Sequence, residues 1–166
     1  TADGWYRTKS TATPIKTDPS IKHGLSLSDD FEGPEPGLQW TFWKEYAPQS
    51  LSFKKQTLWI DAKGSTPSDA RLLLATAEDK NYETQVEVNV GKGNTAGLLL
   101  YYSEKAYAGV VSDGKNFTIY RNAENSFTLP NKLGKRFLAK IQNQGNSVRI
   151  AVSKDGKEWT TLVENM

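Results

Sequence analysis

Apolar and polar residues alternate one by one along much of the chain. Every second position is apolar in 85–90, in 137–142 and in 147–153. Successive side chains of a β-strand point to opposite faces of a sheet, so this period of two is typical of strands with one buried and one solvated face. No stretch shows the period of an amphipathic helix. The alternation therefore predicts an all-β protein.

Turn-forming residues separate the predicted strands at short intervals. Asp113-Gly114 and Asp155-Gly156 indicate hairpins, because glycine accepts a positive φ without steric cost, and 143–146 is a third candidate. Many short strands with regular turns predict an antiparallel two-sheet β-sandwich, with a closed barrel as the alternative. Beyond the three alternating stretches, strands are expected at 38–46, 50–54, 57–62, 71–76, 94–103, 106–112, 115–121, 126–129 and 157–163.

The amino-terminal part differs in composition from the rest of the chain. Residues 1–24 contain threonine, serine, lysine and two prolines without clear periodicity, which is typical of a linker. We expect this segment to be a linker or the tail of a preceding domain, and residues 25–166 to form the sandwich. Trp5 and Tyr6 are unusual residues for a free linker, so we expect them to dock on another surface.

The composition argues against several classes of function. The 21 basic and 19 acidic residues give a net charge of +2, and the lysines are scattered, so no nucleic-acid partner is expected. The absence of cysteine excludes disulfides and thiolate catalysis. The longest clear apolar run, 97–100, is too short for membrane insertion. The only histidine, His23, lies in the predicted linker, so no Ser-His-Asp triad is expected in the sandwich.

Aromatic residues are the most informative candidates for a binding site. Trp43 and Tyr46 lie on the predicted strand at 38–46, and Tyr101 and Tyr107 flank a predicted hairpin. Aromatic rings stack on the C–H faces of sugars while nearby polar groups bond the hydroxyls, so these four are candidate carbohydrate-binding residues. Core packing is the alternative for each of them. Positions in the core are expected for three other aromatic residues, namely Phe31, Trp40 and Trp159.

An acidic cluster surrounds Phe31 beside a predicted strand near 27–32. Asp29, Asp30 and Glu32 make up this cluster, and strand alternation puts Asp30 and Glu32 on one face. Calcium favours carboxylate oxygens as ligands. The sequence therefore predicts a structural calcium site with Asp30 and Glu32 as ligands. The alternative is a solvated strand end with Phe31 buried.

Paired carboxylates can also cleave glycosides. Asp61, Glu83 and Glu87 lie on predicted strands, and the two glutamates share one strand face. They lack the third carboxylate of an E-x-D-x-x-E cluster. Solvated strand faces are therefore the expected places for these three side chains.

Four segments occur in an order that resembles a known family. They are 27–33 (LSDDFEG), 37–40 (GLQW), 96–102 (AGLLLYY) and 153–159 (SKDGKEW). Together they resemble the C-terminal concanavalin-like sandwich of glycoside hydrolase family 43, the β-xylosidase and arabinofuranosidase type. Residues 1–7 resemble the exit strand of the five-bladed propeller in that family.

The resemblance implies a concanavalin-like jelly roll and an accessory, non-catalytic role in an enzyme acting on xylan- or arabinan-type polysaccharide. The family's catalytic carboxylates lie on the propeller, so none of them carries over to this chain. The implied partners are an oligosaccharide or polysaccharide and a catalytic propeller domain of the same polypeptide. A self-standing carbohydrate-binding or adhesion module is the alternative function, and a periplasmic or extracellular bacterial location is expected.

The family's sandwiches run on past the position of Met166 to at least one more strand. The final strand at 157–163 is expected to pair with 147–153 across the Asp155-Gly156 hairpin. A sandwich without the further strand would leave one neighbour unpaired, and a strand at 26–32 is the expected neighbour. Related sandwiches hold a calcium ion near the chain ends, which agrees with the predicted ligands Asp30 and Glu32.

Overall fold

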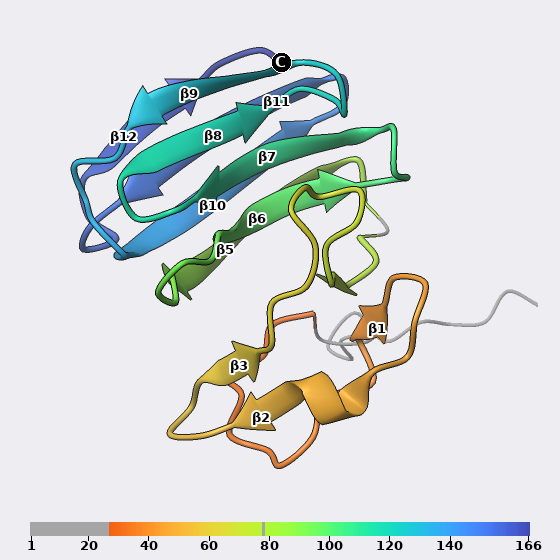
Figure 1. Ribbon diagram of the computed structural model, residues 1–166. Helices are drawn as coiled ribbons and strands as arrows, with labels where there is room; N and C mark the ends of the chain where they lie inside the picture. Colours follow the sequence, from red (N-terminus) through yellow and green to blue (C-terminus); the bar gives the residue numbers. More distant parts are fainter. Residues whose placement is uncertain (1–26, 78) are drawn as a thin grey trace, which may run out of the picture.

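Two four-stranded antiparallel sheets stack face to face and form the main body of the protein (Figure 1). The structure is a computed structural model and describes residues 27–77 and 79–166. One sheet has the strand order β12-β11-β10-β5, and the other has the order β6-β7-β8-β9. The prediction of an all-β, two-sheet antiparallel sandwich is confirmed. The bounds of these strands are β5 Asn81–Asn89, β6 Ala96–Tyr101, β7 Tyr107–Ser112, β8 Asn116–Tyr120, β9 Ser126–Pro130, β10 Arg136–Gln144, β11 Ser147–Ser153 and β12 Trp159–Val163.

Most neighbouring strands are also consecutive in the sequence. Strands β6 to β9 form one meander, and β10 to β12 form another. The exception is β5, which pairs with β10 along nine residue pairs from Asn81↔Gln144 to Asn89↔Arg136, although the whole second sheet lies between them in the chain. Within the described residues β5 is therefore an edge of its sheet.

Short turns join the strands where the sequence predicts them. The β7–β8 turn contains Gly114 at φ 87°, and the β11–β12 turn contains Gly156 at φ 77°. Between β10 and β11 the pair Gln144↔Ser147 leaves a two-residue turn that begins with Gly145 at φ 62°. Each of these conformations is accessible to glycine at little cost. The predicted pairing of the last strand with 147–153 is confirmed.

The hydrophobic core lies between the two sheets and follows the alternation of the sequence. Phe137, at the start of β10, is 1% exposed and meets Phe117 of β8 edge-on, with ring centroids 5.1 Å apart. Interdigitation across the sheets fixes their spacing, because interiors pack as densely as organic crystals. The buried members of this core are Val88, Val90, Val110, Phe117, Ile119, Phe137, Ala139, Ile141, Ile150, Val152 and Val163.

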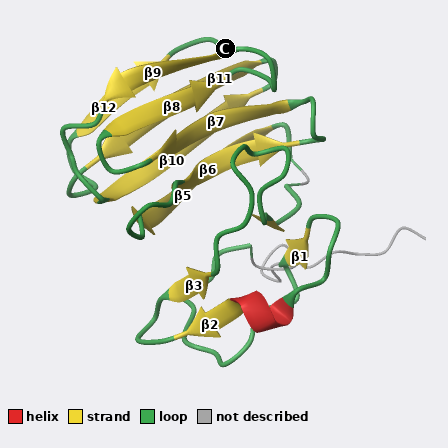
Figure 2. Ribbon diagram, in the orientation of Figure 1, coloured by secondary structure: helices red, strands yellow, loops and turns green. Residues whose placement is uncertain are grey.

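Residues 27–77 form a lobe of their own, here called the N-terminal arm. Strand β1 pairs with β4, and β2 pairs with β3, in two separate two-stranded sheets. Figure 2 shows that this lobe is mostly loop, with the short helix η1 as its helical turn. Within 27–77 and 79–166 no helix is long and apolar enough to cross a membrane. The elements of the arm are β1 Thr41–Phe42, η1 Pro48–Ser50, β2 Leu51–Phe53, β3 Leu58–Ile60 and β4 Leu73–Leu74.

The arm departs most from the sequence prediction. The strand expected at 38–46 is reduced to Thr41–Phe42, because Lys44 adopts φ 65° and breaks the extended backbone. Residues 27–32 form no strand either. There Phe31 takes φ 57°, and the carboxylate of Asp29 accepts a hydrogen bond from the Phe31 N–H at 2.8 Å. Side chains that bond their own backbone in this way compete with strand pairing.

Two aromatic residues expected in the core lie in the arm instead. Phe31 and Trp40 are half-buried and pack on each other at 5.9 Å, and Phe31 also contacts Phe53 at 6.4 Å. The indole N–H of Trp40 donates to Asp29 at 2.7 Å. This small cluster is separate from the core between the two sheets, so the prediction that Trp40 belongs to the main core is wrong.

Candidate functional site: an aromatic cluster between arm and sandwich

The outer face of the second sheet carries stacked aromatic side chains. Tyr101 pairs with Tyr107 across β6 and β7, and Tyr120 lies opposite Gly109 across β7 and β8. These positions alternate with core residues such as Val110, so their side chains face away from the core. The alternation that builds the core thus also builds an aromatic outer face.

Four rings make up this feature, here called the aromatic cluster: Trp43, Tyr101, Tyr107 and Tyr120. Tyr101 stacks on Tyr107 with ring centroids 5.7 Å apart. Trp43 meets Tyr101 edge-on at 5.2 Å, and Tyr120 meets Tyr107 edge-on at 5.5 Å. Trp43 belongs to the arm, where its backbone N–H donates to the Leu72 carbonyl at 3.1 Å. The cluster therefore joins the arm to the sandwich.

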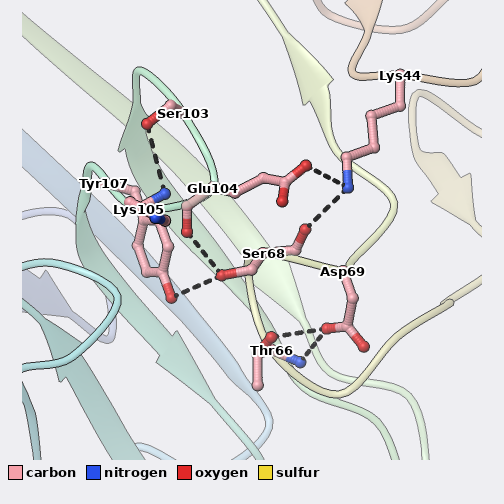
Figure 3. Close-up of polar contacts among 8 residues, drawn as sticks. All are labelled: Lys44, Thr66, Ser68, Asp69, Ser103, Glu104, Lys105 and Tyr107. Atoms are coloured by element: carbon pink, nitrogen blue, oxygen red, sulfur yellow. Dashed lines mark hydrogen bonds and ion pairs between the residues drawn. The ribbon is translucent and has the colours of Figure 1, made fainter.

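Polar contacts join the arm to the tip of the β6–β7 hairpin beside Tyr107 (Figure 3). The Ser68 hydroxyl donates to the Glu104 carbonyl at 2.8 Å and lies 3.3 Å from the Tyr107 hydroxyl. The Lys44 ammonium lies 2.6 Å from the Glu104 carboxylate, and the hydrogen bond between them raises the pKa of Lys44. We call Lys44, Ser68 and Glu104 the latch. Tyr107, with Tyr101 and Tyr120 packed on its ring, is only 5% exposed.

Asp69 holds the loop that carries Ser68. Its carboxylate accepts hydrogen bonds from the Thr66 hydroxyl and N–H, each at 2.7 Å, and from the Ser65 N–H at 3.1 Å. The Thr66 hydroxyl and then the two backbone N–H groups lower the pKa of Asp69 to about 2. A lowered pKa means that this contribution to stability is present above about pH 4 and is lost as the pH falls through 2. The latch loop is therefore anchored by a carboxylate that stays ionised at ordinary pH.

Two polar atoms of the cluster lack a hydrogen-bond partner. Among the described side chains, the buried atoms without one are Trp43 Nε1 and the Tyr101 hydroxyl oxygen. Burial raises the pKa of Tyr101, and the nearby carboxylate of Glu104 raises it further while Lys44 opposes this. The indole N–H of Trp43 and the hydroxyl of Tyr101 thus lie in a largely desolvated environment.

The structure brings together three of the four predicted carbohydrate-binding residues. Trp43, Tyr101 and Tyr107 lie in the aromatic cluster, although the burial of Tyr107 leaves its ring face covered. Tyr46 lies elsewhere, 79% exposed, with Phe42 edge-on at 5.5 Å. Sequence reasoning missed Tyr120 and the latch. The alternation within the predicted strand 115–121 could have placed Tyr120 on the outer face. The latch depends on contacts between distant segments, which the sequence does not show.

The predicted calcium ligands Asp30 and Glu32 each accept a hydrogen bond from a neighbouring residue. Asp30 accepts the Glu32 N–H at 3.2 Å, and the Glu32 carboxylate accepts the side-chain amide of Gln56. No group of three or more His, Cys, Asp or Glu side chains within the described ranges could hold a metal ion. Calcium also takes backbone carbonyl and water oxygens as ligands, so calcium binding at Asp30 and Glu32 stays a prediction.

A calcium titration tests that prediction. If Asp30 and Glu32 bind the ion, adding millimolar calcium to chelator-treated protein raises the melting temperature by mass action, and Asp30→Asn removes the increase. Magnesium at the same concentration controls for ionic strength. An unchanged melting temperature in folded protein would remove the site.

Two of the three candidate catalytic carboxylates, Glu83 and Glu87, form ion pairs across the first sheet. Glu83 lies 2.8 Å from the Lys140 ammonium and accepts the Gln142 amide at 2.7 Å, and Glu87 pairs with Arg136. The hydrogen bond from Lys140 lowers the pKa of Glu83. A general acid for glycoside cleavage needs a raised pKa, so the direction of this shift is the opposite of what that role requires.

Trp159 occupies the outer face of the first sheet and not the core, contrary to expectation. Its indole N–H donates to the Gly156 carbonyl at 3.0 Å, and the Lys140 ammonium lies 4.2 Å from the ring centroid. The side chain thus packs back over its own hairpin. Segment 153–159 is therefore a structural turn.

The stacked sheets, their meander order and the loop-rich arm define the class of concanavalin-like β-sandwich domains. Residues 28–166 match the family described as the β-xylosidase C-terminal concanavalin A-like domain. The chain belongs to this family, which confirms the resemblance seen in the sequence. No curated protein matches the chain.

Two solved structures show the same fold. The crystal structure of the GH43 protein BlXynB from Bacillus licheniformis has a TM-score of 0.74 at 20% identity, and that of a mutant of the same protein has 0.75 at 19%. Each comparison covers 89% of this chain and 32% of the other. The chain thus spans about a third of the length of these relatives.

Proposed function

We propose that the chain is an accessory, non-catalytic domain of a glycoside hydrolase acting on xylan- or arabinan-type polysaccharide. The match of residues 28–166 to a β-xylosidase C-terminal domain carries this proposal. The carboxylates add support, since the resolved pKa shifts of Asp69, Glu83, Asp113 and Asp155 are all downward. Side chains of this kind do not supply the protonated acid that glycoside cleavage needs.

The arm is the part of the domain that we propose to rest on a catalytic domain of the same polypeptide. Five of the seven exposed large hydrophobic residues among those described lie in the arm. Trp59 is 54% exposed and Leu38 is 93% exposed. Exposed apolar surface often marks an interaction site. The five residues are Leu27, Leu38, Tyr46, Trp59 and Ile60. Because polysaccharides stay outside the cell, we also propose a periplasmic or extracellular location.

An activity assay of the chain by itself tests the non-catalytic role. The purified chain is expected to hydrolyse aryl β-xylosides and aryl arabinofuranosides no faster than buffer. Glu83→Gln and Glu87→Gln are expected to leave this background unchanged, because both carboxylates serve in surface ion pairs. Turnover above buffer that either substitution abolishes would refute the proposal.

A self-standing carbohydrate-binding module is the second candidate, favoured by the aromatic cluster on an outer sheet face. The two candidate functions differ in the affinity for glycan that each requires. An accessory domain needs only weak contact with glycan, with dissociation constants on the order of millimolar, whereas an independent module needs about micromolar affinity to stay attached. Sedimentation of the chain with insoluble xylan and arabinan separates them.

A further inference from the structure

Trp43 and Tyr101 place two unpartnered polar atoms at one contact between the arm and the β6–β7 hairpin. Trp43 Nε1 can only donate a hydrogen bond, while the Tyr101 hydroxyl can donate or accept one. Both atoms are buried, and their rings touch at 5.2 Å between centroids. Buried polar groups are nearly always hydrogen-bonded, so two exceptions on rings that touch each other call for a physical reason.

The charges around the two atoms are balanced. Lys44 and Glu104 lie near the Tyr101 hydroxyl and neutralise each other in one ion pair. The carboxylate of Asp69 is already engaged by Ser65 and Thr66. No net charge is left to favour an ion, so a ligand at this place should be neutral. Because the two atoms need hydrogen-bond partners, hydroxyl groups on the ligand would suit them. Sugars combine such hydroxyls with apolar C–H faces that stack on aromatic rings.

The contacts that cover the cluster are suited to opening. The side chains of Lys44 and Glu104 are each 52% exposed, and an ion pair with that much solvent access is weak. Ser68 contributes a single hydroxyl to the Glu104 carbonyl and to Tyr107. Separating the latch would free the arm at Lys44 and Ser68, so that Trp43 can move away from Tyr101 and the two unpartnered atoms become accessible.

We propose that the aromatic cluster is a gated site for a neutral saccharide. The latch covers the site when it is empty, and the bound sugar satisfies Trp43 Nε1 and the Tyr101 hydroxyl when the latch opens. This inference rests on the proposed function for the class of ligand. The same two atoms that bind the sugar lower the stability of the empty domain, because they are buried there without hydrogen-bond partners.

Two measurements on the same variants test this assignment. Calorimetric titration with xylo- and arabino-oligosaccharides gives the affinity, and thermal melting gives the stability. Tyr101→Phe removes one oxygen and keeps the ring. It is expected to raise the melting temperature by about 2–6 °C, because an unsatisfied buried group disappears, and to weaken saccharide binding about tenfold. Tyr102→Phe is the matched control, since Tyr102 is 86% exposed, and both readings are expected to stay unchanged.

Ser68→Ala tests the gate independently of the binding groups. The substitution removes the hydroxyl contacts of the closed latch, so the open form gains population and saccharide binding tightens by about three- to tenfold. The melting temperature is expected to fall in the same variant.

Several outcomes would overturn the gated site. A lower melting temperature for Tyr101→Phe would show that the hydroxyl is already satisfied by a buried water. Unchanged affinity in Tyr101→Phe would show that the sugar binds elsewhere, and weaker binding in Ser68→Ala would show that the latch holds the sugar and does not cover its site. Absence of saccharide binding at millimolar concentration would also refute the inference, while the non-catalytic role, judged by hydrolysis, would stand.

Discussion

Replacing Phe137 with alanine is expected to lower the free energy of unfolding by about 3–5 kcal/mol. The ring is 1% exposed and lies between the two sheets, where it meets Phe117 edge-on at 5.1 Å. Alanine removes that aromatic contact and leaves a cavity that two paired sheets cannot close by a small shift. Denaturation in urea measures the loss as a lower midpoint at constant slope.

Phe127→Ala is the control for this experiment. Phe127 also lies on a strand, β9, but it is 37% exposed and has the guanidinium of Arg121 5.6 Å from its ring centroid. Its loss is expected to cost about 1 kcal/mol or less. Similar costs for the two substitutions would contradict the placement of the core between the sheets.

Gly109→Ala is expected to destabilise the sandwich by about 3 kcal/mol or more. A Cβ at this position would lie 2.3 Å from the Leu98 carbonyl oxygen and 2.8 Å from the Leu99 Cα, both backbone atoms of the neighbouring strand. The backbone at Gly109 also has φ 154°, which side-chain-bearing residues rarely adopt. Relief requires β6 and β7 to separate, which would disturb the core on one side and the aromatic cluster on the other.

The matched substitution is Gly91→Ala, in the turn between β5 and β6. There a Cβ would lie 3.2 Å from the side-chain amide of Asn94, which can move away. We expect a change of about 0.5 kcal/mol or less in either direction. Wild-type stability in Gly109→Ala would mean that β6 and β7 are farther apart than described.

The sandwich could be predicted from the sequence because its strands and turns are specified by residues close together in the chain. Strands β5, β10 and β11 coincide with the clearest alternation, and β7–β8 and β11–β12 turn at the two Asp-Gly pairs. Alternation of apolar and polar residues indicates a strand buried on one face, and an Asp-Gly pair indicates a turn. Both signals act within a few residues of each other.

The arm could not be predicted in the same way. Lys44 takes a positive φ although nothing in its residue type demands it, and this ends the strand that was expected to carry both Trp43 and Tyr46. Trp43 packs against Tyr101, whereas Tyr46 lies on the surface. The contact between Trp43 and Tyr101 joins residues 58 positions apart, so only the tertiary structure reveals it.

The pairing of β5 with β10 has a consequence for how the chain folds during synthesis. Every other neighbour within the two large sheets is the next strand to leave the ribosome, so those hairpins close as soon as they are made. Strand β5 has to wait while β6 to β9 are synthesised, which takes about 2–10 s at ordinary elongation rates. For that interval its nine residues expose an unpaired backbone and two valines, Val86 and Val88. Glu83 and Glu87, on the opposite face of the strand from those valines, then keep the waiting strand from pairing with other nascent chains.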